Sequence, residues 1–190
     1  MMSQTIVKME GISKAFAGIK ALDNVQIDLR QGEIHALMGE NGAGKSTLMK
    51  IMTGVYSRDS GKMYLQNALS NQLEEVEIKS PLAAQKLGLS MVFQEFNLLE
   101  NMNIAENIFI GREPLGAGQT VDKKQLIQNA AVELKKVNLD IDPSTEVSKL
   151  SCGQKQCVEI AKALSFNARV VVFDEPTASL SERESQTLFK

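Results

Sequence analysis

The first third of the chain shows the alternation of hydrophobic and polar residues that is typical of strands. Ile6–Met9 and Val25–Leu29 alternate in the manner of half-buried strands. Glu33–Met38 is a mostly apolar run, which is the pattern of a parallel strand buried on both faces. His35 lies inside this run, so we expect a packed strand residue there and not a catalytic one.

Helical periods follow these strands. Apolar residues at helical spacing begin near Lys45 and end at Gly54. A second helix is expected over Ser80–Gly88, because its serine can cap the start, its proline suits the first turn and its glycine suits the end. Leu89–Phe93 comes directly afterwards as a strand candidate, which delivers Gln94 at its carboxyl end.

The section from about residue 95 to residue 165 has few strand signals. Asp122 can cap an amphipathic helix in this section. The apolar residues along one face of that helix are Leu126, Ala130, Leu134 and Val137. Gly111–Thr120 is expected to be a loop, because it combines glycine, proline and polar residues.

The chain returns to a strand at Val170–Phe173, a short apolar run that we expect to be buried. Ser181–Glu184 has the spacing of a capping box at the start of a helix. The order of elements predicts an α/β fold with an inserted helical region. We expect a core formed by residues 1–94 and 166–190, with a helical subdomain over residues 95–165.

Composition narrows the class of protein. Of the 190 residues 43% are hydrophobic, and the formal net charge is −2, as in an ordinary globular chain. A basic face for nucleic acid is absent from the sequence, and no stretch reaches the roughly 18 apolar residues of a membrane span. The start also lacks the apolar core of a signal peptide, so any membrane role is expected to come through a partner.

The cysteines and the histidine do not predict a zinc site. Cys152 and Cys157 are too few and too close for a disulfide framework, so we interpret them as free thiols of a reducing cytoplasm. The only histidine, His35, is far from both in sequence.

A phosphate-binding loop is the strongest chemical signal. The pattern G-x-x-x-x-G-K-[ST] lies between an expected buried strand and an expected helix, which is the context that this motif requires. Glycines let successive N–H groups face a phosphate, and the helix start adds its positive dipole end. Lys45 would meet the β- and γ-phosphates, and the Ser46 hydroxyl would join the Mg²⁺ shell. The alternative is a glycine-rich turn that happens to contain a lysine. The residues expected to bind ATP here are Gly39, Glu40, Asn41, Gly42, Ala43, Gly44, Lys45, Ser46 and Thr47.

Two carboxylates follow the last predicted strand. Ligands gather at the carboxyl ends of strands in an α/β sheet. Asp174 is suited to hold Mg²⁺, and Glu175 is suited to polarise the attacking water as a general base. Such a pair alone would more often be surface charge, but the phosphate loop favours the catalytic interpretation. A GTPase is disfavoured because the sequence lacks an N-K-x-D motif.

Several further segments give the chain a resemblance to a known family. Leu150–Gln154, followed by a helix and a strand, resembles the signature segment of ABC ATPases. Gln94 resembles their Q-loop glutamine, Ala178–Ser181 resembles their D-loop, and Phe16 stands where the family stacks an aromatic ring on adenine. The resemblance implies a P-loop NTPase core with a mostly parallel sheet, an antiparallel portion near the amino terminus and a helical insert.

The resemblance also implies a mechanism shared by two copies. ABC ATPases hold ATP between the phosphate loop of one subunit and the signature segment of the other. Carried onto this chain, the signature residues Ser151, Cys152, Gly153 and Gln154 would meet the ATP of the partner copy. Gln94 would act in catalysis with Lys45 and Glu175, and would sense the Mg²⁺ that Ser46 and Asp174 hold.

A narrower resemblance covers Phe93–Pro114, which looks like the ATPases of ribose, galactose and xylose importers. It implies an ATP-hydrolysing subunit on the cytoplasmic face of the membrane, which drives a separate permease. An external sugar-binding protein would take part indirectly, a second ATPase domain would complete the pair, and nucleic acid is not implied.

Two departures from the family pattern leave alternatives open. Cys152 replaces the first of two glycines in the signature. If the backbone at this position needs a positive φ, a residue with a side chain would be strained there. Its thiol could make hydrolysis sensitive to oxidation, although a tolerated small substitution is the simpler interpretation. The family's switch histidine is absent up to Lys190, which favours a piece of a longer domain. The alternatives are a nucleotide-binding module without turnover and a soluble ABC ATPase outside transport.

Overall fold

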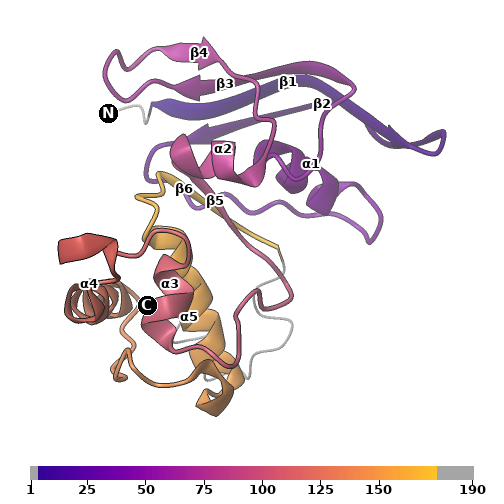
Figure 1. Ribbon diagram of the computed structural model, residues 1–190. Helices are drawn as coiled ribbons and strands as arrows, with labels where there is room; N and C mark the ends of the chain where they lie inside the picture. The colour runs from indigo at the N-terminus through magenta and orange to yellow at the C-terminus, as the bar shows by residue number, and fades with distance from the viewer. Residues whose placement is uncertain (1–3, 175–190) are drawn as a thin grey trace. The chain divides into compact units, whose positions relative to one another are not determined.

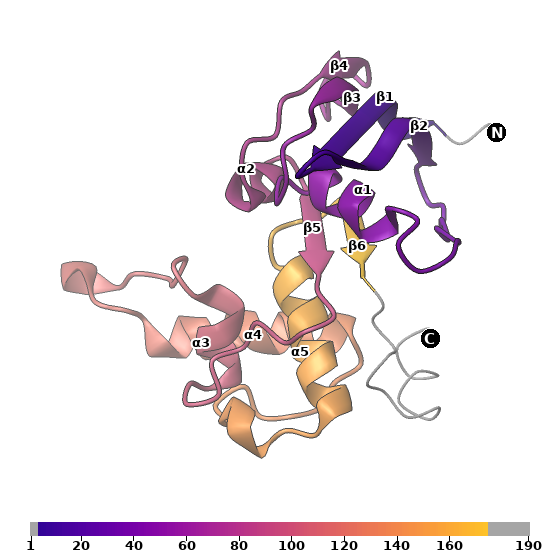
Figure 2. The ribbon, with the colours of Figure 1, turned by 90° about the vertical axis from the view of Figure 1, so that its right-hand side faces the viewer.

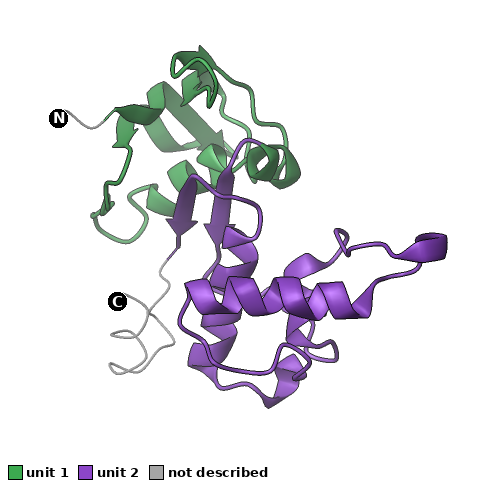
Figure 3. Cartoon of the chain, turned by 90° about the vertical axis from the view of Figure 1, so that its left-hand side faces the viewer, with its two compact units in different colours: residues 1–86 green, residues 87–190 purple. Residues whose placement is uncertain are grey.

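The computed structural model describes residues 4–174 of the chain. The chain divides into two compact units, one of residues 1–86 and the other of residues 87–190 (Figure 3). Each unit contains a sheet of its own, four-stranded in the first and two-stranded in the second. The predicted domains, a core of residues 1–94 and 166–190 and a helical subdomain of residues 95–165, are drawn from motifs, whereas the two units are defined by contacts. The predicted domain boundaries therefore stay a prediction.

The sheet of the first unit is antiparallel throughout. Its strands are β1 (Thr5–Phe16), β2 (Ile19–Arg30), β3 (Ser60–Gln66) and β4 (Leu73–Glu75), in the order β2-β1-β3-β4. The strands predicted at the amino terminus fall inside β1 and β2, so this prediction is confirmed. A two-residue turn joins β1 to β2, and both of its residues have positive φ.

Two helices cover one face of this sheet (Figures 1 and 2). They are α1 (Lys45–Met52) and α2 (Pro81–Lys86), which confirms both predicted helices. The Ser80 hydroxyl accepts a hydrogen bond from the Ala83 N–H, as expected for a residue that caps a helix. The buried apolar residues of this unit include Leu48, Ile51 and Met52 on α1, and Val7, Met9, Ile12 and Met63 on the sheet.

The segment Glu33–Met38 corrects a prediction. It forms no strand in the structure, and Ile34 is 99% exposed and Met38 88% exposed. The physical reason lies in its polar residues. The Glu33 carboxylate accepts from the Arg30 N–H at 3.0 Å and contacts His35 Nδ1 at 3.0 Å, and the His35 contact lowers the pKa of Glu33. Glu33 and His35 thus satisfy one another at the surface, and His35 is not the packed strand residue that the apolar run predicts.

The second unit holds a parallel pair of strands. These are β5 (Leu89–Val92) and β6 (Val170–Phe173), with Leu89 opposite Val170 and Val92 opposite Phe173. Both strands lie where the sequence predicts them. β6 is less buried than expected, however, since only its third residue, Val172, is buried among the four.

Helices fill the chain between β5 and β6. They are α3 (Ile104–Phe109), α4 (Lys123–Lys136) and α5 (Cys152–Leu164), with 3₁₀ turns η1 (Ala117–Gln119) and η2 (Val147–Lys149). Asp122 caps α4 by accepting from the Gln125 N–H, as predicted. A capping box between Asn103 and Glu106 starts α3, and the predicted loop over Gly111–Thr120 contains η1 and an isolated bridge from Leu115 to Val121.

The helices share one apolar cluster, and α5 connects it to the strands. The buried members of the cluster are Ile104, Ala105, Ile108, Leu126, Ala130, Leu134, Val147, Leu150, Val158 and Ala161. The predicted face of α4 supplies three of them, and Val137 packs against the cluster from outside. Ile160 and Ala163, which are further along α5, pack instead with Val92 of β5. No helix within residues 4–174 is long and apolar enough to cross a membrane.

Candidate functional site

The predicted phosphate loop leads directly into α1. Gly44 is the N-cap of α1 with φ 85° and ψ 4°, and no side chain caps the helix. The first turn also contains no acidic residue. The first N–H groups of a helix have no partner inside the helix, and their dipoles favour an anion. The start of α1 therefore presents donors and no negative charge.

Lys45 lies across this loop. Its Nζ donates to the carbonyl oxygen of Gly39 at 2.8 Å and to that of Glu40 at 2.9 Å. Both acceptors are neutral, so the ammonium charge is not neutralised by these bonds. A phosphate oxygen would be a stronger acceptor than either carbonyl, because hydrogen bonds between charged groups are the strongest.

Gly44 has no room for a side chain. A Cβ there would lie 2.4 Å from the carbonyl oxygen of Ala21 and 2.7 Å from Cδ2 of Leu22. Gly42 also has a positive φ, of 81°, but a Cβ there would meet nothing within 4 Å. Gly44 is thus needed where the loop packs on β2, whereas Gly42 borders open space. Together with Lys45 and the uncapped helix start, this geometry suits a bound phosphate chain.

The remaining loop residues lie in the exposed loop and in the first turn of α1. Ser46 and Thr47 are half-buried in the first turn of α1, while Glu40, Asn41 and Ala43 are exposed in the loop. The hydroxyl of Ser46 is a hard oxygen ligand of the type that Mg²⁺ accepts. The amide oxygen of Gln94 and the carboxylate of Asp174 are of the same type. The donor set predicted for magnesium is therefore chemically suitable.

Phe16 stands at the end of β1 and is 41% exposed. Its ring meets that of Tyr56 in an edge-to-face contact, with centroids 5.2 Å apart and planes at 67°. The Nζ of Lys14 lies 5.5 Å from the centroid of the Phe16 ring, and that of Lys50 lies 5.6 Å from the centroid of Tyr56. Two half-exposed rings with two ammonium groups form a surface suited to an electron-rich aromatic base of an anionic ligand.

Asp59 fixes the chain beside this pair of rings. Its carboxylate accepts from Lys14 Nζ at 2.7 Å and from the Ala15 N–H at 2.7 Å. The hydrogen bond from Lys14 holds the pKa of the Asp59 carboxyl below its ordinary value. Asp59 therefore orders the last residues before Phe16. Sequence reasoning missed both Tyr56 and Asp59.

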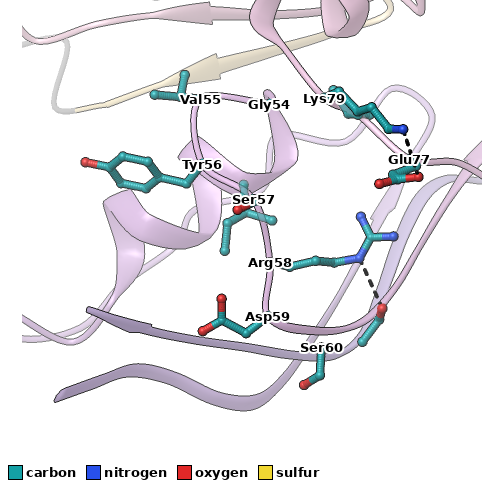
Figure 4. A pocket seen from close by; sticks show the side chains of 12 residues that line it. Gly54, Val55, Tyr56, Ser57, Arg58, Asp59, Ser60, Glu77 and Lys79 are labelled. Atoms are coloured by element: carbon teal, nitrogen blue, oxygen red, sulfur yellow. Dashed lines mark hydrogen bonds and ion pairs between the residues drawn. The ribbon is translucent and has the colours of Figure 1, made fainter. Parts of the chain in front are cut away.

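A polar pocket of about 480 Å³ lies next to Tyr56 in the same unit. It is bordered by the chain that follows α1 and by the segment before α2 (Figure 4). Arg58 is held there by a hydrogen bond from its Nε to the Gly61 carbonyl at 3.1 Å, and Lys79 pairs with Glu77 at 3.7 Å. The charged groups that line the pocket are of both signs, so it does not by itself indicate one ligand.

Gln94 and Asp174 leave the two parallel strands at the same edge. Gln94 is exposed and lies two residues beyond the end of β5, while Asp174 directly follows β6 and is 8% exposed. The Asp174 N–H donates to the carbonyl oxygen of Val92 at 3.1 Å, which continues the pairing of the strands. The structure thus confirms the strand-end position that the sequence predicts for both residues.

The signature segment is the start of α5. Ser151 is the N-cap, and its hydroxyl accepts from the Gln154 N–H at 3.3 Å. The Gln154 side chain in turn accepts from the Ser151 N–H at 2.8 Å, so the two residues form a capping box. Gln154 is therefore engaged within its own chain, and Gly153 lies between them in the first turn.

Cys152 corrects an expectation of strain. It is the first residue of α5, it is exposed, and it is not among the non-glycine residues with positive φ. A helical position accepts any ordinary side chain, so replacement of a glycine by cysteine costs no backbone strain here. Cys157 is half-buried on the same helix, and neither cysteine forms a disulfide, as predicted.

The candidate residues belong to both units. The phosphate loop and Phe16 lie in residues 1–86, whereas Gln94, the signature segment and Asp174 lie in residues 87–190. Glu175 and the segment Ala178–Ser181 lie outside the described residues. Within residues 4–174, no group of three or more His, Cys, Asp or Glu side chains could hold a metal ion.

Comparison with known proteins places residues 22–178 in the family model described as ABC transporter. A Burkholderia cenocepacia protein named for ribose/galactose/methyl galactoside import is 49% identical over 99% of this chain. The ribose import ATP-binding protein of Clostridium perfringens is 46% identical over 97% of the chain, and the xylose import ATP-binding protein of Geobacillus kaustophilus is 46% identical over 98%. The chain spans 36% of the length of each of these relatives.

Solved structures show the same likeness. An ATP-binding cassette of an ABC transporter in its ADP conformation matches with a TM-score of 0.82 and 29% identity, over 98% of this chain and 75% of that one. A dimeric bacterial ABC transporter cassette matches with a TM-score of 0.74 and 27% identity, over 96% of this chain and 79% of that one. The predicted fold class, a P-loop NTPase domain with a helical insert, agrees with both.

Proposed function

Since this chain belongs to the ABC transporter family, we propose that it binds Mg–ATP and hydrolyses it to drive sugar uptake through a separate membrane permease. The observation that carries the proposal is the phosphate loop. Lys45 spans two neutral carbonyls at the uncapped start of α1, and Gly44 closes the loop where no side chain fits. The proposal that the transported substrate is a sugar rests on the names of the relatives, which are import proteins for ribose, galactose or xylose.

Binding of the nucleotide involves the residues of the first unit. Lys45 exchanges its carbonyl partners for phosphate oxygens, and the first N–H groups of α1 donate to the same oxygens. Phe16 stacks on the adenine, held in place by the edge of Tyr56. Asp59 supports this contact indirectly, because it fixes Lys14 and Ala15 next to the ring.

Hydrolysis involves the residues at the strand ends of the second unit. Bound Mg²⁺ supplies neutralisation of the charge that develops on the phosphate oxygens. When the metal is bound, Ser46 of the first unit and Asp174 of the second would hold it, and Gln94 would sense it. Glu175 accepts the proton of the attacking water as a general base. These roles follow from the family resemblance and from the strand-end positions of Gln94 and Asp174.

Two copies or two domains share the chemistry in this proposal. Ser151 and the Gly153 main chain lie in the first turn of α5, where the positive end of the helix dipole favours an anion. They would meet the ATP held by a second ATPase domain, as the dimeric arrangement of one structural neighbour suggests. The chain would bind the permease at the cytoplasmic face of the membrane. An external sugar-binding protein would supply the sugar to the permease.

A direct test uses tyrosine fluorescence. The chain has no tryptophan and two tyrosines, so Tyr64→Phe leaves Tyr56 as the only strong emitter. We expect Mg–ATP to change the Tyr56 emission in a saturable manner. Tripolyphosphate, which lacks the base, should compete with ATP without changing the emission. Phe16→Ala should weaken Mg–ATP binding roughly fivefold to hundredfold, because it removes the stacking contact with the base.

A second ligand, tripolyphosphate, shows which result would contradict the role of Phe16. Tripolyphosphate affinity should be the same in the Phe16→Ala variant and in the protein with Phe16. If the two affinities for Mg–ATP were also equal, the base would not contact Phe16, although the phosphate loop could still bind. Absence of any nucleotide binding would contradict the proposed function itself.

Turnover separates an ATPase from a nucleotide-binding module. The second candidate function, a nucleotide-binding module without turnover, is favoured by one observation. The only histidine of the sequence, His35, precedes the phosphate loop and pairs with Glu33, so it does not stand where the family has its switch histidine. We expect phosphate release by the chain with Mg–ATP, and Glu175→Gln should slow it about 10²- to 10⁴-fold while leaving ATP affinity unchanged. Binding without phosphate release by either protein would establish the module instead.

A further inference from the structure

The main chain of Asn97 is bound from both sides by side chains of α5. The Glu159 carboxylate accepts from the Asn97 N–H at 2.5 Å. Lys162, three residues further along the helix, donates from Nζ to the Asn97 carbonyl oxygen at 3.2 Å. A single helix therefore satisfies both main-chain polar groups of Asn97, which lies in the irregular segment between β5 and α3.

Glu159 is an unusual residue for its place. It is 6% exposed and lies on α5 between the buried residues Val158 and Ile160. Burial raises the pKa of the Glu159 carboxyl, and the Asn97 N–H and the charge of Lys162 oppose that rise in part. An apolar side chain would avoid the cost of burying a carboxylate. The carboxylate is explained by the bond that it makes to the Asn97 segment.

Two other contacts hold the same segment to the helices. Asn107 of α3, which is 1% exposed, accepts from the Leu99 N–H at 2.7 Å and donates to the Leu99 carbonyl oxygen at 3.0 Å. Lys155 of α5 pairs with Glu100 at 2.6 Å. The segment is thus attached at residues 97, 99 and 100, and two of these attachments come from α5.

The helix that holds this segment also begins with the signature turn. Ser151 caps α5, and Glu159 lies eight residues later, which corresponds to about 12 Å along a helix. Gln94 is three residues before Asn97 in the chain. One rigid element therefore connects the Ser151 turn to the segment that carries Gln94, and Glu159 and Lys162 bind that segment three residues after Gln94.

We propose that Glu159 is a positioning residue that fastens the Asn97 main chain to α5, so that the Gln94 segment and the Ser151 turn move as one body. Its structural part depends only on contacts within the second unit. Its functional part rests on the proposed function, because it concerns the position of Gln94 during hydrolysis. Glu159 itself does not contact the nucleotide in this proposal.

Hydrogen exchange at the Asn97 amide tests the structural part. Glu159→Met keeps the length of the side chain and removes the acceptor, so we expect the Asn97 amide to exchange at least roughly tenfold faster. Glu159→Gln keeps an acceptor oxygen in the same shape and should restore most of the protection. Lys155→Met is the matched control, because it releases Glu100 and leaves the Asn97 bonds in place. The amide of Leu134 in α4 reports general loosening of the unit.

Phosphate release tests the functional part. Glu159→Met should lower kcat for Mg–ATP with little change in KM, because the phosphate loop lies in the other unit, and Glu159→Gln should recover most of kcat. Unchanged exchange of the Asn97 amide in Glu159→Met would overturn the proposal. Equal acceleration at Asn97 and Leu134 would also overturn it, by showing a role in stability alone. The hydrogen-exchange comparison tests the attachment by Glu159 even if the chain does not bind nucleotide. Failure of the Glu159 proposal can therefore be distinguished from failure of the proposed function.

Discussion

Lys45→Ala should weaken Mg–ATP binding by roughly two orders of magnitude, measured by calorimetric titration. Lys45 provides the only side-chain ammonium that the described structure places across the phosphate loop. Its bonds to phosphate oxygens join charged groups, and each such bond contributes about 1.5–3 kcal/mol. The gain on binding is reduced because the ammonium must first leave the carbonyls of Gly39 and Glu40. Loss of one or two such bonds therefore corresponds to about a hundredfold change.

Lys62→Ala is the matched control for this experiment. Lys62 lies on β3 in the same unit and pairs with Glu75 at 3.0 Å, away from the loop. Both variants change the net charge equally, so long-range attraction of the nucleotide changes equally. Equal affinities in the two variants would show that Lys45 does not bind phosphate. Binding by wild type that is weakened only in Lys45→Ala would establish the loop as the site.

Arg112→Ala should lower the free energy of unfolding by about 2–4 kcal/mol. Arg112 follows α3, and its guanidinium donates to the Ile108 carbonyl oxygen at 2.8 Å and to the Ser165 hydroxyl at 2.7 Å. The same group lies 3.6 Å from the centroid of the Phe166 ring. Arg112 therefore connects the end of α3 to the end of α5. Urea unfolding followed by far-ultraviolet circular dichroism measures the loss.

Arg112→Lys distinguishes the geometry from the charge. Burial lowers the pKa of the Arg112 guanidinium from its ordinary value, but an arginine remains charged in a protein. A lysine keeps this charge and lacks the planar group that stacks on Phe166 and donates to acceptors on both Ile108 and Ser165. We expect Arg112→Lys to lose at least about half of the stability lost by Arg112→Ala. Wild-type stability in Arg112→Lys would mean that charge alone is sufficient.

Local signals in the sequence predict most of the helical part of the structure. Asp122 caps α4, and Leu126, Ala130 and Leu134 are buried along one face of it, because capping and apolar periodicity act within a few residues. The phosphate loop is predictable for the same reason. Gly44, Lys45 and the start of α1 form one continuous stretch whose geometry depends little on the rest of the chain.

The segment Glu33–Met38 shows where such reasoning fails. Its apolar residues give the pattern of a buried strand, but a strand also needs neighbours to pair with. Pairing depends on distant parts of the chain, which the pattern does not contain. Glu33 and His35 instead bind each other and the Arg30 N–H. A carboxylate and an imidazole two residues apart could have suggested this local contact.

Tyr56 and Glu159 were missed for a different reason. Both act through residues far away in the sequence, Tyr56 on Phe16 and Glu159 on Asn97. Nothing in the spacing along the chain connects these pairs. The only sequence signal for Glu159 is a carboxylate in an otherwise apolar stretch of α5, Val158–Ala161. Gln154 was predicted to face a partner's nucleotide, but its position also fits a capping box with Ser151, which the structure shows.

The exposed thiol at the start of α5 makes the chain easy to label. Cys152 is exposed and helical, while Cys157 is half-buried, so a maleimide probe should attach first at Cys152. A spin label there would sit in the turn that begins with Ser151. Distances between two labels would then report how closely two copies approach one another, with and without ATP. The residue that departs from the family's double glycine thus provides a natural probe position for observing association.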